Sequence, residues 1–285
     1  MDYKKPAEVI ALMIQSGTEK GKLSTADLLI RGGLSGMLLG IGTTLAVTGT
    51  VQTGISLAGA LLFPICFVAV VLMGLELVTG SFALLPVAYF HKNLSMPALL
   101  RNLALVYAAN LLGALVYAFL FWASVTNFGQ AHASPLIPAI IKIAEAKTTG
   151  YGQLGGIGVA TALTKGMLCN WMVTMGVVLA LTTSSTTGKI LAAWIPIFMF
   201  FAQGFEHAVV NMFVIPEGML LGAKVSIGDW WIYNQLPVTL GNIVGALLFT
   251  ALPLYFTYHR QKEKAHPARE SMNRPEIDVD ATVMA

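Results

Sequence analysis

The sequence predicts an all-α integral membrane protein with six transmembrane segments, and three features support this prediction. First, hydrophobic residues make up 56% of the 285 residues and charged residues only 11%, against roughly 45–50% and 25% in soluble domains. The mean hydropathy is correspondingly high, at +0.72. Second, long apolar stretches recur along the chain. Third, motifs of the first half return in the second half.

Six apolar regions are long enough to cross a hydrocarbon core about 30 Å thick, which takes roughly 20 helical residues. They cover residues 28–50, 55–90, 98–125, 157–183, 190–222 and 235–258. The second and fifth are too long for one span, because a helix over 55–90 would measure roughly 54 Å at about 1.5 Å per residue. Gly74, Glu76, Gly80 and Pro86 interrupt the second region. We therefore expect both long segments to be interrupted.

An internal repeat relates the two halves of the chain. Gly-Met-Leu at 36–38 recurs at 166–168, and the Gly-x-Glu of 74–76 recurs at 204–206, both at an offset of 130 residues. The Asn-x-x-Gly-Ala-Leu of 110–115 recurs at 242–247, at an offset of 132. Each half holds an odd number of spans, so the second half enters the bilayer from the opposite side. We predict two inverted three-helix repeats, residues 28–125 and 157–258, with a pathway near the bilayer midplane.

The distribution of Lys and Arg predicts the orientation. Most of them lie in the two tails and in the turns after the second and fourth regions, so both termini are expected to be cytoplasmic. Residues 1–27 are predicted to form an amphipathic segment, which lies on the membrane surface or acts as a gating lid. Residues 28–258 form the transmembrane domain. The polar residues 259–285 are predicted to be a disordered cytoplasmic tail.

Several classes of function are disfavoured by the composition. The net charge of +3 comes without aromatic residues interleaved among the basic ones, so no nucleic-acid partner is expected. Cys66 and Cys169 lie inside apolar segments, which indicates neither a disulfide framework nor a thiolate metal cluster. We expect membrane lipid around the protein, and neither a cofactor nor a metal.

The strongest local signal is the pair Glu206-His207 within the apolar fifth segment. One ionisable residue inside a span costs at least about 2.5–3.5 kcal/mol on insertion scales, so a functional role is the default interpretation. The alternative is that the pair only caps two half-helices. A zinc site is disfavoured, because no second His or Cys lies at ligand spacing from His207.

Several motifs in order resemble the formate/nitrite transporter family, over most of the chain. They are the break at 74–81, Lys-Gly-Met-Leu-Cys-Asn-Trp at 165–171, Gly-Phe-Glu-His at 204–207 and Leu-Pro-Val-Thr-Leu-Gly-Asn at 236–242. The resemblance implies an aquaporin-like protomer, a homopentamer with one pore per subunit, and a bacterial or archaeal inner membrane. It also implies transport and no enzymatic activity.

The resemblance also implies roles for individual residues. His207 is similar to the family's central pore histidine and Thr79 to its partner, beside Glu206 and the polar pair Asn170 and Asn242. Two apolar constrictions flank this centre, and the residues that correspond to them are Phe63, Phe67, Leu77, Val173 and Phe200. Lys147 resembles a vestibule lysine that pairs with Glu206. A glycine-rich insertion at 150–156 follows it, however, and leaves Lys165 as a rival.

The expected substrate is a small monovalent weak acid. Moving a bare carboxylate through a dry constriction costs tens of kcal/mol in the Born limit. Protonating one of pKa about 3.7 at pH 7 costs only roughly 4–5 kcal/mol. We therefore predict that the anion crosses as the neutral acid, with His207 exchanging a proton or donating a hydrogen bond. Asn-Met-Phe-Val-Ile-Pro at 211–216 resembles formate-type members of the family more than nitrite-type ones, so formate ranks first. Nitrite, hydrosulfide, acetate and lactate remain open, as does passive against proton-coupled transport.

Two other classes of function remain alternatives to a channel. A membrane-embedded enzyme would need a nucleophile or a metal constellation near His207, where the sequence supplies only Thr79 and asparagines. A purely structural membrane protein would have no reason to keep paired ionisable groups at matching breaks.

Overall fold

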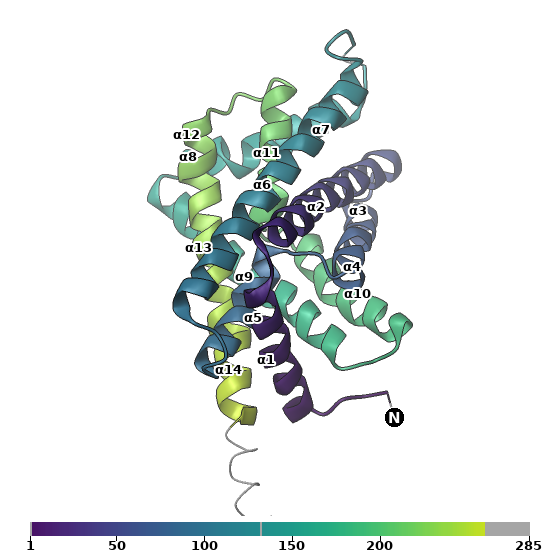
Figure 1. The fold of residues 1–285 in the computed structure, drawn as a ribbon. Helices are drawn as coiled ribbons and strands as arrows, with labels where there is room; N and C mark the ends of the chain where they lie inside the picture. The colour runs from purple at the N-terminus through teal and green to yellow at the C-terminus, as the bar shows by residue number, and fades with distance from the viewer. Residues whose placement is uncertain (1, 132, 260–285) are drawn as a thin grey trace, which may run out of the picture.

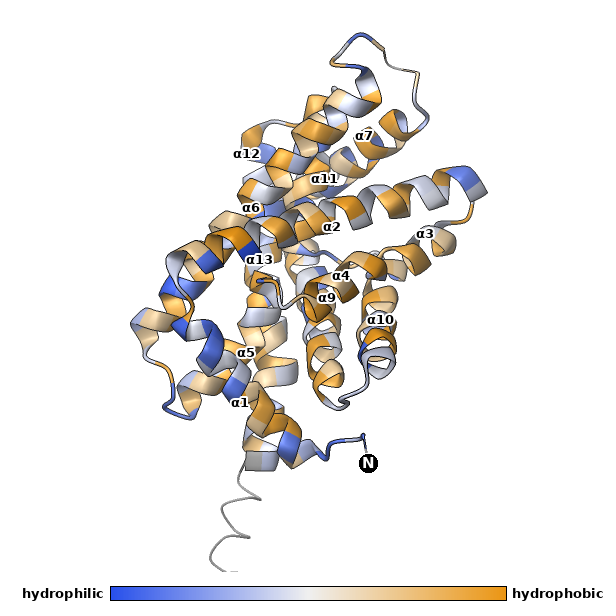
Figure 2. Cartoon of the chain, turned by 45° about the vertical axis from the view of Figure 1, so that its right-hand side comes forward, coloured by the Kyte–Doolittle hydropathy of each residue, from blue (hydrophilic) through white to orange (hydrophobic). Residues whose placement is uncertain are grey.

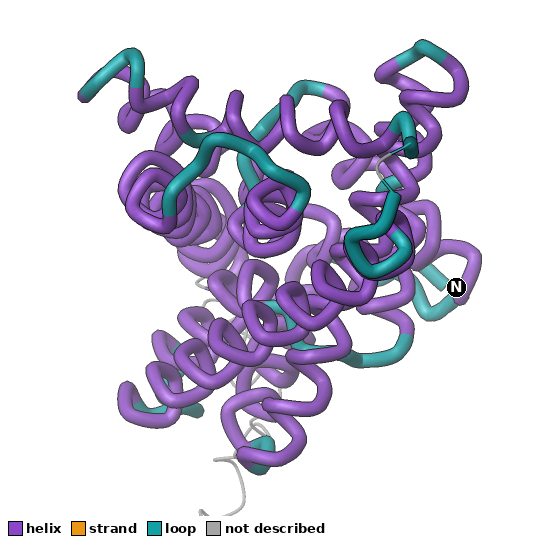
Figure 3. Tube along the Cα trace, turned by 90° about the horizontal axis from the view of Figure 1, so that it is seen from above, coloured by secondary structure: helices purple, strands orange, loops and turns teal. Residues whose placement is uncertain are grey.

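The computed structural model describes residues 2–131 and 133–259, and these residues form helices and loops without a strand (Figures 1 and 3). The first half contains α1 (Pro6–Lys22), α2 (Thr25–Thr53), α3 (Ser56–Leu62), α4 (Pro64–Leu72), α5 (Val78–Phe90) and α6 (Met96–Thr126). The second half contains α7 (Leu136–Lys147), α8 (Thr149–Gly152), α9 (Gly156–Leu181), α10 (Thr186–Ala202) and α11 (Ala208–Leu220). The last helix runs through α12 (Ile227–Trp230), η1 (Trp231–Gln235), α13 (Leu236–Ala246), η2 (Leu247–Ala251), α14 (Leu252–Leu254) and η3 (Tyr255–His259).

Four of the described helices are long and apolar enough to cross a membrane. They are Thr25–Thr53, Met96–Thr126, Gly156–Leu181 and the continuous last helix Ile227–Tyr258. The remaining apolar helices are shorter, and they are α3–α4, α5, α10 and α11. Figure 2 shows hydrophobic residues along the helices and hydrophilic ones at many of the loops and helix ends. The chain is therefore an all-helical integral membrane protein.

The interruptions expected in the second and fifth segments are present, and their geometry is the same. Gly74 and Gly204 have φ of 62° and 64°, a left-handed conformation that ends helices and suits glycine. The chain then runs extended to Leu77 and His207, whose φ and ψ are −116°, 118° and −113°, 119°. The helices α5 and α11 begin directly after them.

One asparagine holds each break in place. Asn110 Oδ1 accepts from the Val78 amide at 3.0 Å, and its Nδ2 donates to the carbonyls of Gly32 and Glu76. Asn242 repeats this pattern with Ala208, Gly166 and Glu206. Extended backbone inside a membrane leaves polar groups without helical partners. The two side chains supply those partners.

These hydrogen bonds change the register expected for the first helix of each half. The sequence match at 36–38 and 166–168 suggests that Gly36 corresponds to Gly166. In the structure Gly32, four residues earlier, makes the contact that Gly166 makes. Four residues are about one helical turn. Aligning Gly36 with Gly166 therefore puts the correct face of the helix toward its neighbour, but it shifts the helix by one turn along its axis.

Short helices lie at both ends of the molecule (Figure 1). The helix α1 lies beside the last helix at one end, and α7, α8 and α12 lie at the other. The N-terminal helix packs its apolar side on α5 instead of lying apart: Gly17 fits so closely that a Cβ would lie 2.1 Å from the Leu84 carbonyl oxygen. The helix α7 falls in the segment between the third and fourth predicted spans.

The extreme N-terminus is tied to the turn between α9 and α10. Lys4 N donates to the Thr182 carbonyl, and Asp2 accepts from the Thr183 hydroxyl and the Ser184 amide. These hydrogen bonds hold the pKa of Asp2 below its ordinary value. The predicted disordered tail lies, from residue 260 onward, outside the described residues.

Candidate functional site

The two breaks meet at a buried hydrogen bond between Thr79 and His207. Thr79 Oγ1 lies 3.0 Å from His207 Nε2, and the two residues are 0% and 2% exposed. His207 Nδ1 accepts from the Val210 amide at 3.2 Å and so caps α11. A nitrogen that accepts carries no proton, so the neutral imidazole has its proton on Nε2 and donates it to Thr79. The capping role suggested by the sequence therefore coexists with a contact between the two halves.

Two cavities approach this pair. A cavity of about 240 Å³ is lined by His207, Val210, Phe200 and Lys147, among others, and we call it the α7-side cavity. A second cavity, of about 200 Å³, is lined by Leu77, Phe67 and Lys20, among others, and we call it the α1-side cavity. Because α7 and α1 lie at opposite ends of the molecule (Figure 1), the cavities extend in opposite directions from the two breaks.

The residues expected to form constrictions are all buried, and Phe200 contacts the central pair directly. The Phe200 ring stacks on the His207 ring with centroids 5.7 Å apart, and Phe63 contacts Phe200 edge-on at 5.7 Å. Phe67 and Leu77 line the α1-side cavity. Phe63 and Val173 are also buried, but they are not among the residues that line either cavity.

Lys147 forms an ion pair with Glu206, with Nζ 2.7 Å from Oε2. The Glu206 side chain is 3% exposed and that of Lys147 is 20% exposed, so the carboxylate is inside the protein while the ammonium reaches the α7-side cavity. The carbonyl of the rival Lys165 accepts from the Glu206 amide at 3.3 Å, but its side chain has another partner, with Nζ 5.7 Å from the centre of the Tyr151 ring. The glycine-rich insertion therefore leaves Lys147 in contact with Glu206.

Glu206 also accepts hydrogen bonds from neutral side chains that we did not predict. Tyr151 Oη donates to Oε1 at 2.8 Å, and Asn211 Nδ2 donates to Oε2 at 2.8 Å. Asn234 then links the group, because it accepts from Asn211 and donates to the Lys147 carbonyl. Asn211 follows Glu206 by five residues, and Glu206 precedes the first residue of α11, so helical spacing gave no signal for this contact.

A second ion pair occupies the corresponding position in the first half, and sequence reasoning missed it. Lys20 Nζ lies 2.8 Å from Glu76 Oε1, with side chains 19% and 3% exposed. Span length alone identifies Glu76 only as an interruption of the second predicted span. The repeat of Gly-x-Glu at 74–76 and 204–206 already indicated that Glu76 has the place of Glu206. Lys20 lies in the N-terminal helix α1, which corresponds to none of the predicted spans. The repeat therefore gave no indication that Lys20 pairs with Glu76.

Asn170 and Asn242, predicted to face the pore, have different contacts. Asn170 Nδ2 donates to the carbonyls of Thr79 and Asn242, at 3.1 and 2.7 Å, and its Oδ1 is buried without a partner among the described residues. Asn242 uses its whole amide on the backbone of the second break. Of the two, Asn170 retains a hydrogen-bond acceptor beside Thr79 and His207.

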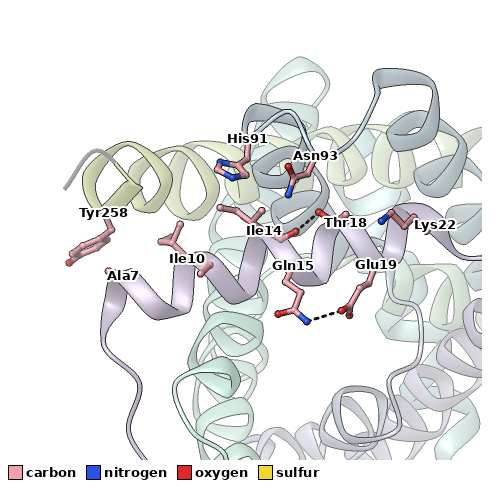
Figure 4. A pocket seen from close by; sticks show the side chains of 11 residues that line it. Ala7, Ile10, Ile14, Gln15, Thr18, Glu19, Lys22, His91, Asn93 and Tyr258 are labelled. Carbon is pink, nitrogen blue, oxygen red and sulfur yellow. Dashed lines mark hydrogen bonds between the residues drawn. The ribbon is translucent and has the colours of Figure 1, made fainter. Parts of the chain in front are cut away.

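A further cavity, of about 440 Å³, lies away from this centre along α1 (Figure 4). Its wall includes His91 and Asn93 after α5, and Tyr258 from the end of the last helix. The α1 side chains in it are partly engaged, since Gln15 donates to Glu19 and Thr18 to the Ile14 carbonyl. It contains none of the residues at the two breaks.

Glu217 is a third buried carboxyl group, on α11. It is 0% exposed, and both carboxyl oxygens lack a hydrogen-bond partner among the described residues. Burying such a group unpaired costs about 1–3 kcal/mol or more. We expect Glu217→Met to raise the free energy of unfolding by about 1–3 kcal/mol, measured as a higher midpoint of thermal unfolding in detergent. Glu217→Gln, which keeps a buried polar group, should gain less, and a lower midpoint for Glu217→Met would refute the expectation.

These features define a class of protein. Two opposed cavities, each with a lysine, approach a buried polar pair at two helix breaks. A helical membrane protein with this arrangement has the architecture of a channel or transporter. The chain belongs to the formate/nitrite transporter family, whose profile matches residues 7–256. The members of this family are channels and transporters and not enzymes.

The chain resembles particular members over nearly its whole length. It is 33% identical to a probable formate transporter of Methanothermobacter thermautotrophicus, over 91% of this chain and 98% of that protein. Among solved structures it is similar to an ion channel of the same family, with a TM-score of 0.76, 25% identity and coverage of 87% and 98%. It also shares the fold of a pentameric formate channel with formate bound, with a TM-score of 0.68, 24% identity and coverage of 82% and 98%.

Proposed function

We propose that the protein is a membrane channel for small monovalent weak-acid anions, with formate as the preferred substrate. The observation that carries this proposal is the Thr79–His207 hydrogen bond between two cavities that each contain a lysine paired to a buried glutamate. The relative named as a probable formate transporter supports formate as the first candidate. Nitrite, hydrosulfide, acetate and lactate are the alternatives of the same chemistry.

The proposed pathway runs from the Lys147 vestibule to the Lys20 vestibule. Each ammonium attracts the anion, and the anion then takes up a proton as it leaves water, because the neutral acid crosses an apolar region at far lower cost. The constrictions are assigned to Phe63, Phe67, Leu77, Val173 and Phe200. At the centre, Thr79 accepts the Nε2 proton of His207 and donates its own hydroxyl proton to the substrate, with Asn170 and Asn242 beside them.

The proposed topology is six spans in two inverted three-helix repeats, with α3–α5 and α10–α11 as the interrupted spans. In it α2, α6, α9 and the last helix cross the membrane whole, and both termini are cytoplasmic, so Lys147 lies outside. We further propose a homopentamer with one pore per subunit, in a bacterial or archaeal inner membrane. The similarity to a pentameric channel supports this assembly.

Uptake of labelled formate into proteoliposomes tests the function. We expect uptake to increase as the external pH falls from 7 to 5, because the fraction of protonated formate rises about tenfold per pH unit when the pH is well above a pKa of about 3.7. The same liposomes are assayed with nitrite, hydrosulfide, acetate and lactate. Liposomes without protein serve as the control for passive leakage of the neutral acids.

The outcomes separate the alternatives. Uptake that exceeds the leakage for another anion but not for formate would replace formate as the substrate. No protein-dependent uptake of any of the five would refute the proposed function. Adding a protonophore tests whether a proton crosses with the anion, since accumulation of a species that crosses as the neutral acid depends on the pH gradient and collapses with it.

A further inference from the structure

We propose that Tyr151 is a positioning residue of the outer ion pair, which keeps the Lys147 charge available to the incoming anion by holding the Glu206 carboxylate. This inference rests on the proposed function and adds a residue from the glycine-rich insertion to it.

The two oxygens of the Glu206 carboxylate have separate partners. Oε2 receives the Lys147 ammonium at 2.7 Å and the Asn211 amide at 2.8 Å. Oε1 receives the Tyr151 hydroxyl at 2.8 Å. Tyr151 is itself 7% exposed, so water is a poor substitute for its hydroxyl. Hydrogen bonds to ionised groups are about twice as strong as hydrogen bonds between neutral groups. The Tyr151 hydroxyl therefore contributes substantially to stabilising the negative charge of Glu206.

The first half shows the same ion pair without such a donor. Glu76 Oε1 pairs with Lys20 at 2.8 Å, while Glu76 Oε2 is buried with no partner among the described residues. The difference between the two sites is thus the set of neutral donors around the carboxylate. In the second half Tyr151 occupies the oxygen that the first half leaves unpaired.

Glycines in and next to the insertion allow the close packing that places the Tyr151 hydroxyl at Glu206. A Cβ on Gly158 would lie 1.9 Å from the Tyr151 carbonyl oxygen, and one on Gly152 would lie 2.9 Å from the Tyr233 ring. Both glycines therefore permit close packing around Tyr151 that a larger residue would prevent. Gly155, with φ of 58°, turns the chain into α9, where Lys165 lies.

Lys165 acts on the same hydroxyl through the ring. Its Nζ lies 5.7 Å from the Tyr151 ring centroid, within the range of a cation–π interaction. A cation over the ring withdraws electron density and strengthens the hydroxyl as a donor. The lysine that competes with Lys147 in the sequence therefore supports Glu206 indirectly.

Loss of the hydroxyl would change the electrostatics of the outer vestibule. Without Tyr151, Oε1 becomes a buried, uncompensated acceptor, and the Lys147 ammonium is drawn to both oxygens. The field that the vestibule presents to an anion then becomes less positive. Such a field effect is screened by salt, since the Debye length falls from about 30 Å at 0.01 M to about 3 Å at 1 M.

The test is the KM for formate uptake into proteoliposomes at low and high ionic strength. For Tyr151→Phe we expect KM at low salt to rise about threefold to tenfold, with little change in the maximal rate, and the difference to shrink at 1 M salt. Tyr233→Phe, the matched control, also lacks a hydroxyl beside the insertion but leaves Glu206 untouched, and should retain the wild-type KM. A purely structural role would lower the maximal rate at both salt concentrations.

A second variant covers the case in which Tyr151→Phe does not fold. Lys165→Met keeps the hydroxyl and removes the cation over the ring, and should raise KM at low salt by about twofold. An unchanged KM at low salt in the folded variants, a shift equal at both salt concentrations, or an equal shift in Tyr233→Phe would each overturn the proposal. Wild-type protein is assayed first, so a failure of formate transport itself is recognised separately.

Discussion

Asn242→Ala is expected to destabilise the protein by on the order of 4 kcal/mol, because one side chain makes three buried hydrogen bonds and each group left unpaired costs about 1–3 kcal/mol. The groups affected are the Ala208 amide and the carbonyls of Gly166 and Glu206. The Glu206 and Ala208 groups flank His207 at the second break, so formate uptake should be lost together with stability. Thermal unfolding in detergent and uptake into proteoliposomes measure the two effects.

The control is Asn93→Ala, which removes an exposed amide between α5 and α6 and should leave both properties at wild-type levels. Asn242→Asp gives a finer test. It retains an acceptor for the Ala208 amide but cannot donate to the two carbonyls, so it should be intermediate at most. A wild-type unfolding midpoint for Asn242→Ala would show that the break does not depend on this side chain.

Lys147→Met is expected to reduce formate uptake at least tenfold and to cost about 3–5 kcal/mol of stability, the range for removing one partner of a buried ion pair. The variant leaves the negative Glu206, 3% exposed, facing the cavity from which the anion would enter. The charge at the α7-side cavity would then repel the incoming anion instead of attracting it. Uptake rates and unfolding midpoints check the two parts separately.

Two further variants make this result specific. Lys142→Met removes an exposed lysine from the same helix α7 and should behave like wild type. The double variant Lys147→Met/Glu206→Gln removes the stranded charge and should recover most of the stability without recovering the uptake. Equal loss of stability in the double and single variants would contradict the role of the ion pair.

Part of the fold could be predicted because it depends on local physics. Hydrophobic stretches of about 20 residues identify the long helices α2, α6 and α9, and glycine at Gly74 and Gly204 marks the breaks because only glycine readily adopts positive φ. The Glu206-His207 pair was identifiable because ionisable residues are costly in a membrane. The helix α7 and the partner of Glu76 were not, since neither α7 nor Lys20 belongs to a motif or to the repeat.

The sequence by itself determined the class of fold, the family and the two breaks with His207 at one of them, because composition, span length and glycine position act along the chain. Only the tertiary structure decided which lysine meets Glu206, that Tyr151 of the insertion supplies its other donor, and that Asn110 and Asn242 hold the breaks. These choices depend on contacts between segments tens of residues apart, where a single helical turn of register changes every partner. The equivalence of Gly32, and not Gly36, with Gly166 is the clearest example.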